Sequence, residues 1–128
     1  MSQNICYIPV SIGELYDKYT ILQIKQDKIT CTEKLKSVNN ELEYLKNIIN
    51  EYTLDKELIN ELKTINETLW TIEDSIRDKE RVKTFDEEFI KLARNVYITN
   101  DKRSEVKNKI NNILKSEIND IKGYSSYL

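Results

Sequence analysis

One stretch of the chain, Asn66–Arg81, gathers the side chains best suited to hold a ligand. It contains the only tryptophan, Trp70, and four acidic and three basic residues follow within eleven positions. On a helix that turns about 100° per residue, Glu73 and Glu80 lie at the edge of an apolar stripe and Arg77 lies beside it. An unpaired buried charge is costly, so these side chains need partners. The stretch is therefore the first candidate for a site.

Three interpretations of this stretch stay open, and the first two need no metal. In the structural one, Arg77 pairs with Glu73 and Glu80 at helical spacing, and Arg103 completes a polar layer that fixes how the helices align. In the second, basic and aromatic side chains bind the phosphate and rings of a phosphosugar or nucleotide sugar. The candidate ligand-binding residues are Lys25, Trp70, Glu73, Arg77, Glu80, Arg94, Tyr97 and Arg103.

The third interpretation is an enzyme in which Glu73 and Glu80 hold a divalent ion. Helical nucleotide pyrophosphohydrolases use paired carboxylates in this way, and oxygen ligands favour Mg²⁺ or Mn²⁺. Glu73 and Glu80 do not form the usual Glu-x-x-Glu or Glu-x-x-Asp pairs, because they are seven positions apart and Asp74 and Asp78 face elsewhere. No other cofactor is expected, and whether the protein is an enzyme stays open.

The composition excludes several classes of site. The chain has no histidine, which excludes Ser-His and Cys-His nucleophiles and histidine metal ligands. Two distant glycines cannot build a phosphate-binding loop or a dinucleotide fingerprint. The net charge is −2, and although the residues from Phe89 onward have a charge of +4, no basic-and-aromatic pattern favours nucleic acid. Cys6 and Cys31 accompany neither a signal peptide nor a membrane-spanning apolar run, so we expect reduced thiols in a cytoplasmic protein.

The elements that position these residues are predicted to be helices. Few glycines and prolines, with many charged and aliphatic residues, indicate an all-α fold: an antiparallel bundle or helical hairpins of about four long helices in one domain, 1–128. Ser11 with Glu14 forms a capping box that begins a helix reaching about Ile29. The same spacing recurs at Thr30–Glu33 and at Thr84–Glu87.

Apolar stripes define the remaining helices. Leu35–Tyr52 and Leu58–Ile76 keep coiled-coil-like spacing. The last stripe, Phe89–Ile113, keeps one register through its polar middle, which favours one helix over two. We expect that helix to end at Gly123 and residues 123–128 to form a loose tail.

The first ten residues are predicted to form an extended arm. Its segment Ile5–Val10 is apolar and β-prone, and Pro9 forbids a central strand. The arm packs on the bundle or pairs with a second copy. Together with more apolar stripe than four short-linked helices need to bury, it indicates a homo-oligomer.

Short connections make neighbouring helices antiparallel and set the level of each residue. This places the start of the second helix beside residues 72–74. It also places one group of candidates toward one end of the bundle, namely Lys25, Glu73, Arg77, Glu80 and Arg94. A second group follows further along, namely Trp70, Tyr97 and Arg103.

Three blocks of the chain resemble an uncharacterised family of small all-helical proteins. They are IPVSIGELYDKYTIL (8–22), LWTIEDSIRDKE (69–80) and FIKLARNVYITNDKR (89–103). The blocks match at Lys18, Thr20, Lys25, Trp70, Glu73, Asp74, Arg77, Asp78, Glu80, Arg94, Tyr97, Asn100, Asp101 and Arg103. Tyr16 and Tyr19 stand where other members often carry Leu or Ile.

The resemblance implies a fold and a context, not a reaction. Members are bacterial and are sometimes encoded near glycosyltransferase or surface-polysaccharide genes. The composition of this chain, rich in Ile, Asn, Lys and Tyr, indicates an AT-rich genome, either bacterial or viral. We therefore expect an interaction or small-anion-binding protein near surface-glycan metabolism.

Overall fold

A computed structural model describes residues 4–127 of the chain. Within that range the chain forms four helices and no strand, which confirms the predicted all-α class. The helices are α1 (Ile12–Lys28), α2 (Thr32–Ile49), α3 (Lys56–Arg81) and α4 (Glu87–Ile113). None of the helices described is long and apolar enough to cross a membrane.

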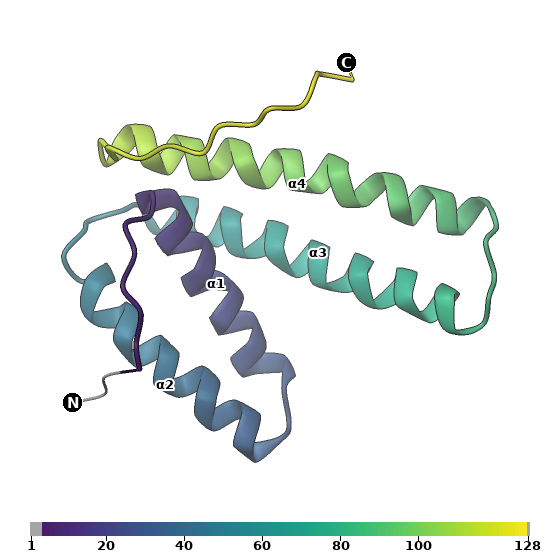
Figure 1. Cartoon of the computed structure of the whole chain (residues 1–128), viewed down its shortest axis with the longest axis horizontal. Coiled ribbons are helices and arrows are strands. Elements are labelled where there is room, and N and C mark those ends of the chain that lie inside the picture. The colour runs from purple at the N-terminus through teal and green to yellow at the C-terminus, as the bar shows by residue number, and fades with distance from the viewer. Residues whose placement is uncertain (1–3, 128) are drawn as a thin grey trace.

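The helices form two hairpins, α1–α2 and α3–α4, and α1 packs against both of its neighbours in the second hairpin (Figure 1). Helices α3 and α4 run side by side, and α1 crosses one end of that pair. Helix α2 packs only on α1, so the prediction that its start lies beside residues 72–74 is wrong. The physical reason is that α1 is buried on two faces and therefore separates α2 from α3.

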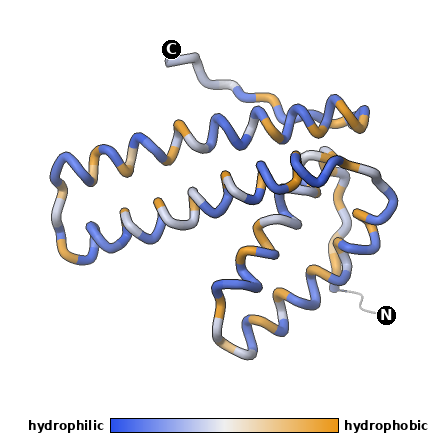
Figure 2. Tube along the Cα trace, turned by 180° about the vertical axis from the view of Figure 1, so that it is seen from behind, coloured by the Kyte–Doolittle hydropathy of each residue, from blue (hydrophilic) through white to orange (hydrophobic). Residues whose placement is uncertain are grey.

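One face of α1 packs against α2, and the other against α3 and α4. Toward α2, the core cluster consists of Leu22, Val38 and Leu42. Toward α3 and α4, it consists of Tyr16, Leu62, Val106 and Ile110. Figure 2 shows hydrophobic and hydrophilic residues alternating along the helices, as expected for helices with buried faces.

The helix starts follow local capping chemistry. The predicted cap at Ser11 is confirmed, because its Oγ accepts a hydrogen bond from the Glu14 N–H at 3.0 Å. The caps predicted at Thr30 and Thr84 are wrong, since α2 begins after Cys31 and α4 after Asp86. The Asp86 carboxylate accepts from the Phe89 N–H at 3.0 Å, and a carboxylate also suits the positive end of the helix dipole.

Helix α4 is a single helix through Asn100 and Asp101, as its register predicted. It ends at Ile113, ten residues before the predicted stop at Gly123. The chain turns through Lys115, whose φ is 55°, and then runs back along α4 (Figure 1). This C-terminal segment, 114–127, thereby covers part of the α4 surface.

The predicted N-terminal arm is extended from Asn4 to Val10. It runs along the α1–α2 hairpin (Figure 1). Residues 1–3 of the predicted arm and Leu128 of the predicted tail lie outside the described residues.

Candidate functional site

A buried carboxylate lies where α1 crosses α3 and α4. The Asp17 side chain is 1% exposed. Arg103 of α4 holds it with two hydrogen bonds, since Nε donates to Oδ1 at 2.9 Å and Nη2 donates to Oδ2. Asn66 of α3 donates from Nδ2 to the same Oδ1 at 2.9 Å. Asp17 therefore joins three helices through charged and polar contacts, which satisfies the demand of a buried charge for partners.

Lys107 of α4 extends this network toward the surface. Its buried Nζ lies 2.6 Å from Glu14, 3.9 Å from Asp17 and 3.8 Å from Asp120 of the C-terminal segment. The hydrogen bonds that Arg103 donates to Asp17 raise the pKa of Arg103, although burial opposes the change. The network thus ties both hairpins and the C-terminal segment together.

Helices α1 and α4 approach closely at Gly13. Its N–H donates to Asn111 Oδ1 at 2.6 Å. A Cβ at this position would collide with the backbone carbonyl of Lys107. Glycine is therefore required for the approach that brings Asp17 to Arg103.

The first surface depression beside this network has a volume of about 430 Å³, and we call it the Trp70 depression. Within it, Arg77 Nη1 donates to Glu73 Oε2 at 2.6 Å, and the Arg77 side chain is 63% exposed. Most of its wall comes from α3. Its lining residues are Ile21, Asn66, Leu69, Trp70, Glu73, Asp74, Arg77, Asn100 and Arg103.

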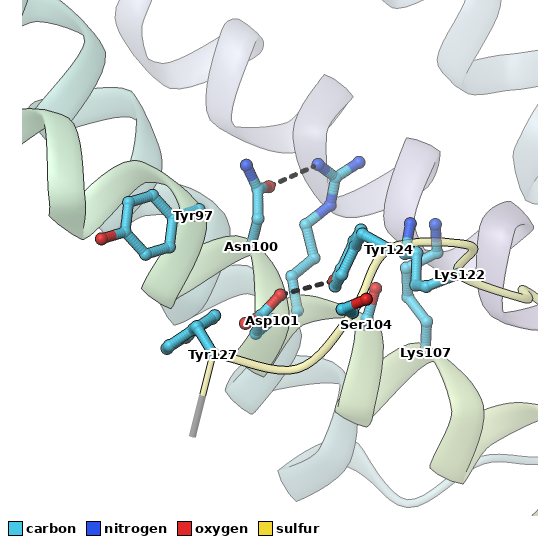
Figure 3. Close-up of a pocket in the computed structure, with 10 residues that line it drawn as sticks. Tyr97, Asn100, Asp101, Ser104, Lys107, Lys122, Tyr124 and Tyr127 are labelled. Atoms are coloured by element: carbon cyan, nitrogen blue, oxygen red, sulfur yellow. Dashed lines mark hydrogen bonds between the residues drawn. The ribbon is translucent and has the colours of Figure 1, made fainter.

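The second depression, the Tyr97 depression, has a volume of about 570 Å³ and lies between α4 and the C-terminal segment. Figure 3 shows Tyr97 and Tyr127 at one end and Lys107 and Lys122 at the other. The rings of Tyr97 and Tyr127 meet edge to face, with centroids 5.3 Å apart. The lining residues are Tyr97, Asn100, Asp101, Arg103, Ser104, Lys107, Lys122, Tyr124, Ser125 and Tyr127.

Asp101 holds the C-terminal segment at the Tyr97 depression. The Tyr124 hydroxyl donates to its Oδ1 at 2.6 Å (Figure 3). A hydrogen bond to the same carboxylate raises the pKa of Tyr127 to about 12. In return, the hydrogen bonds from the two tyrosines lower the pKa of Asp101.

Asn100 and Arg103 line both depressions, which therefore meet at these two side chains. Their positions are fixed, because Arg103 is held by Asp17 and donates from Nη1 to Asn100 Oδ1 at 3.3 Å. The meeting point is thus a rigid polar ridge between a tryptophan and a group of tyrosines.

Five of the eight predicted ligand-binding residues line this joined surface. They are Trp70, Glu73, Arg77, Tyr97 and Arg103. The other three do not line either depression. Glu80 pairs with Lys83 at 3.1 Å, Arg94 is exposed on α4, and Lys25 lies near the end of α1.

The predicted burial of the Glu73–Arg77–Glu80 cluster is wrong. Glu73 and Arg77 do pair, but near solvent, because α1 and α2 do not cover this part of α3. A polar layer containing Arg103 does exist, yet its partner is Asp17, which the sequence analysis missed together with Lys107 and Asn111. The available signal was the stripe Gly13, Asp17, Thr20 at helical spacing, which lies opposite the apolar positions Leu15, Tyr19 and Leu22 of the same helix.

The carboxylates proposed as metal ligands lie apart. Glu73 binds Arg77, and Glu80 binds Lys83. Across residues 4–127, no group of three or more potential metal-ligating side chains occurs. The Mg²⁺ or Mn²⁺ site stays a prediction without a supporting cluster.

The chain belongs to the family described as "Family of unknown function (DUF6165)", whose model matches residues 6–128. Membership of an uncharacterised family is thus confirmed, and the match includes the arm from Cys6, all four helices and the C-terminal segment. No curated protein and no solved structure matches the chain. The expected bacterial or viral origin and the link to surface glycans stay predictions.

Proposed function

We propose that this member of a family of unknown function binds a phosphorylated sugar across the Trp70 and Tyr97 depressions. One observation carries the proposal: the two depressions, each with aromatic side chains, meet at Asn100 and Arg103. A ligand with two parts, such as a nucleotide sugar, could place one part on each side of that ridge. A smaller phosphosugar would occupy one side.

The Trp70 depression offers the groups that a sugar phosphate needs. The half-buried ring of Trp70 presents an apolar face for a sugar ring, and Glu73 and Asp74 can accept hydrogen bonds from hydroxyls. Arg77 has five N–H donors, and its hydrogen bonds to Glu73 use only those of Nη1. The remaining donors are available to a phosphate.

The Tyr97 depression offers aromatic edges and two further cations. Tyr97 and Tyr127 stand at one end and can contact a nucleobase or a second ring. Lys107 is already bound to Glu14, so Lys122 is the more available cation, although it contacts Asp120 at 3.2 Å. The ring-binding end and the cationic end of this depression are thus separate.

The charge of the joined surface favours a ligand of low charge. Four cationic side chains line it, against three acidic ones, and Asp17 lies behind Arg103. A ligand with one or two phosphates and many hydroxyls fits this balance better than a polyphosphate. This chemistry also agrees with the surface-glycan context that the family resemblance implied.

The proposal is tested by thermal shift with the full chain against hexose phosphates and nucleotide sugars. At 100 times its dissociation constant, a ligand stabilises by about 2.7 kcal/mol, which raises Tm by roughly 10 °C in a chain of this size. We expect Arg77→Gln to remove the shift. Arg94→Gln is the matched control, because Arg94 is exposed and lies outside both depressions.

Two results would overturn the proposal. One is a wild-type Tm that no phosphorylated sugar changes. The other is equal loss of the shift in Arg77→Gln and Arg94→Gln, which would indicate general attraction to positive charge. A Tm rise with Mg²⁺ or Mn²⁺ alone, abolished by Glu73→Gln, would instead support the metal-dependent interpretation.

A further inference from the structure

We propose that the N-terminal arm, Ile5–Val10, pairs antiparallel with the arm of a second copy of this chain. The pairing would form a symmetric dimer about a two-fold axis through the two arms. The surface involved lies on the α1–α2 hairpin, away from the ligand depressions. The inference is therefore independent of the proposed function.

The arm leaves apolar side chains in water although it lies against its own helices. Tyr7 is 75% exposed and Ile8 is 69% exposed. They are adjacent residues of a segment that has no helix, turn or bend and that runs as an open trace along the α1–α2 hairpin (Figure 1). Packing on the chain's own helices has therefore left both side chains largely exposed.

The backbone of Ile5–Val10 also has no partner strand in the described part of the chain. Among the residues that the structure describes, no backbone hydrogen bond involves Ile5–Val10. Exposed N–H and C=O groups on an apolar, β-prone segment form a template for another strand. Pro9 has no N–H and limits the ladder to the residues before it.

A second copy of the same arm is the occupant that fits this template. Ile5–Val10 carries no charged side chain, so two antiparallel arms bring no like charges together. Both arms contribute exposed apolar residues, so pairing would remove apolar surface of each copy from water. A charged partner segment would gain nothing from this neutral surface.

Apolar side chains of α1 and α2 lie beside the arm and would contact the paired arms. A groove of about 760 Å³ runs between the arm and the α1–α2 face. Tyr44 and Ile48 of α2 line it and are themselves exposed. The ion pair between Lys18 and Glu41, at 2.8 Å, lies at the same groove and supplies a polar border. An apolar centre with a polar border is typical of a protein interface.

The two exposed cysteines make the geometry directly testable. Cys6 lies in the arm, and Cys31 lies at the connection between α1 and α2. We expect a short bis-maleimide to link two copies through Cys6 in the Cys31→Ser variant, and not through Cys31 in the Cys6→Ser variant. Nearby N–H groups of Lys34 and Glu33 lower the pKa of Cys31. A lowered pKa increases the reactive thiolate fraction of Cys31, which makes it a stringent control.

Sedimentation of the full chain at micromolar concentration gives the second readout. We expect a dimer for the wild type and a monomer for Ile8→Asp, whose fold should be unchanged because Ile8 is exposed. Ile121→Asp is the matched control, since Ile121 is 87% exposed in the C-terminal segment, and it should remain dimeric.

Three outcomes would overturn the inference. A wild-type monomer at high concentration would remove the dimer. A dimer that survives Ile8→Asp and is not linked through Cys6 would place the interface elsewhere. Cross-linking through Cys31 at the same rate as through Cys6 would show that the copies are linked by random encounters and not by pairing of the arms.

Discussion

At the scale of single residues, the ion pair of Asp17 and Arg103 differs in kind from that of Glu73 and Arg77. The first holds a carboxylate that is 1% exposed, while the second lies near solvent. Removing one partner from a buried pair leaves a charge that water cannot reach, whereas an exposed pair is replaced by water. The two arginines therefore have unequal effects on stability.

We expect Arg103→Met to destabilise the fold by about 3 kcal/mol, because it leaves the buried Asp17 carboxylate without its guanidinium partner. Arg77→Met makes the same change at the exposed pair and should cost less than about 1 kcal/mol. Urea unfolding of both variants measures the difference. Equal losses would contradict the assignment of the buried network to Asp17 and Arg103.

Gly13 is the second residue whose replacement has a defined consequence. Alanine is the better helix former by up to about 1 kcal/mol, so it would stabilise α1 if the new methyl group met nothing. The collision with the Lys107 carbonyl makes the substitution destabilising instead. We expect Gly13→Ala to lower the free energy of unfolding by about 1–3 kcal/mol. Gly123→Ala is the control, because its Cβ would meet no atom within 4 Å. A stabilised Gly13→Ala variant would show that α1 and α4 are further apart.

At the scale of elements, the C-terminal segment and α4 are joined through Asp101 and two tyrosines. The pKa of Tyr127 is raised from 10.0 to about 12 by its hydrogen bond to Asp101. A raised pKa means that the contact contributes fully below pH 10 and is lost as the pH rises toward 12. At the acid side, the lowered pKa of Asp101 means that its contribution is lost as the pH falls below 3.8.

Ultraviolet titration of the tyrosines tests this contact. In the wild type, one tyrosine should ionise near pH 12, later than an ordinary phenol. Tyr127→Phe should remove that late step. If Tyr127→Phe removes an ordinary step instead, the segment does not rest on Asp101.

The helices themselves were predictable because their signals are local. Apolar spacing and the Ser11 cap gave the helix type and the approximate bounds, and unbroken register gave α4 as one helix. The pairing of helices was not predictable in the same way, since short connections suit both a four-helix bundle and two hairpins. The burial of Asp17 was not predictable for the same reason. A charged residue on a helix can be buried only if another helix supplies a partner, here Arg103 of α4.

At the scale of the whole molecule, α1 joins two hairpins, and the far end of the α3–α4 pair extends beyond it (Figure 1). The Asp17 network lies at the junction, and the ligand depressions lie beside it. The far turn lies away from α1 and α2 (Figure 1), and Val82 and Phe85 are exposed there. Stability should therefore decrease from the junction toward that turn.

Amide hydrogen exchange measures this gradient. We expect the slowest exchange around Asp17 and along α4 near Val106, and faster exchange at the α3 and α4 ends that flank Phe85. Uniform protection along both long helices would contradict a junction-centred fold.

The most direct test of the central claim is an NMR titration of the full chain with the phosphorylated sugar that gives the largest thermal shift. A two-part ligand across the Asn100–Arg103 ridge should move the Trp70 indole signal, the Asn100 side-chain amide and the amide of Tyr127 together, with one dissociation constant. The Arg94 and Lys25 amides should stay unchanged. Signals that move only around Arg94 or Lys25, or a spectrum that no phosphorylated sugar alters, would contradict it.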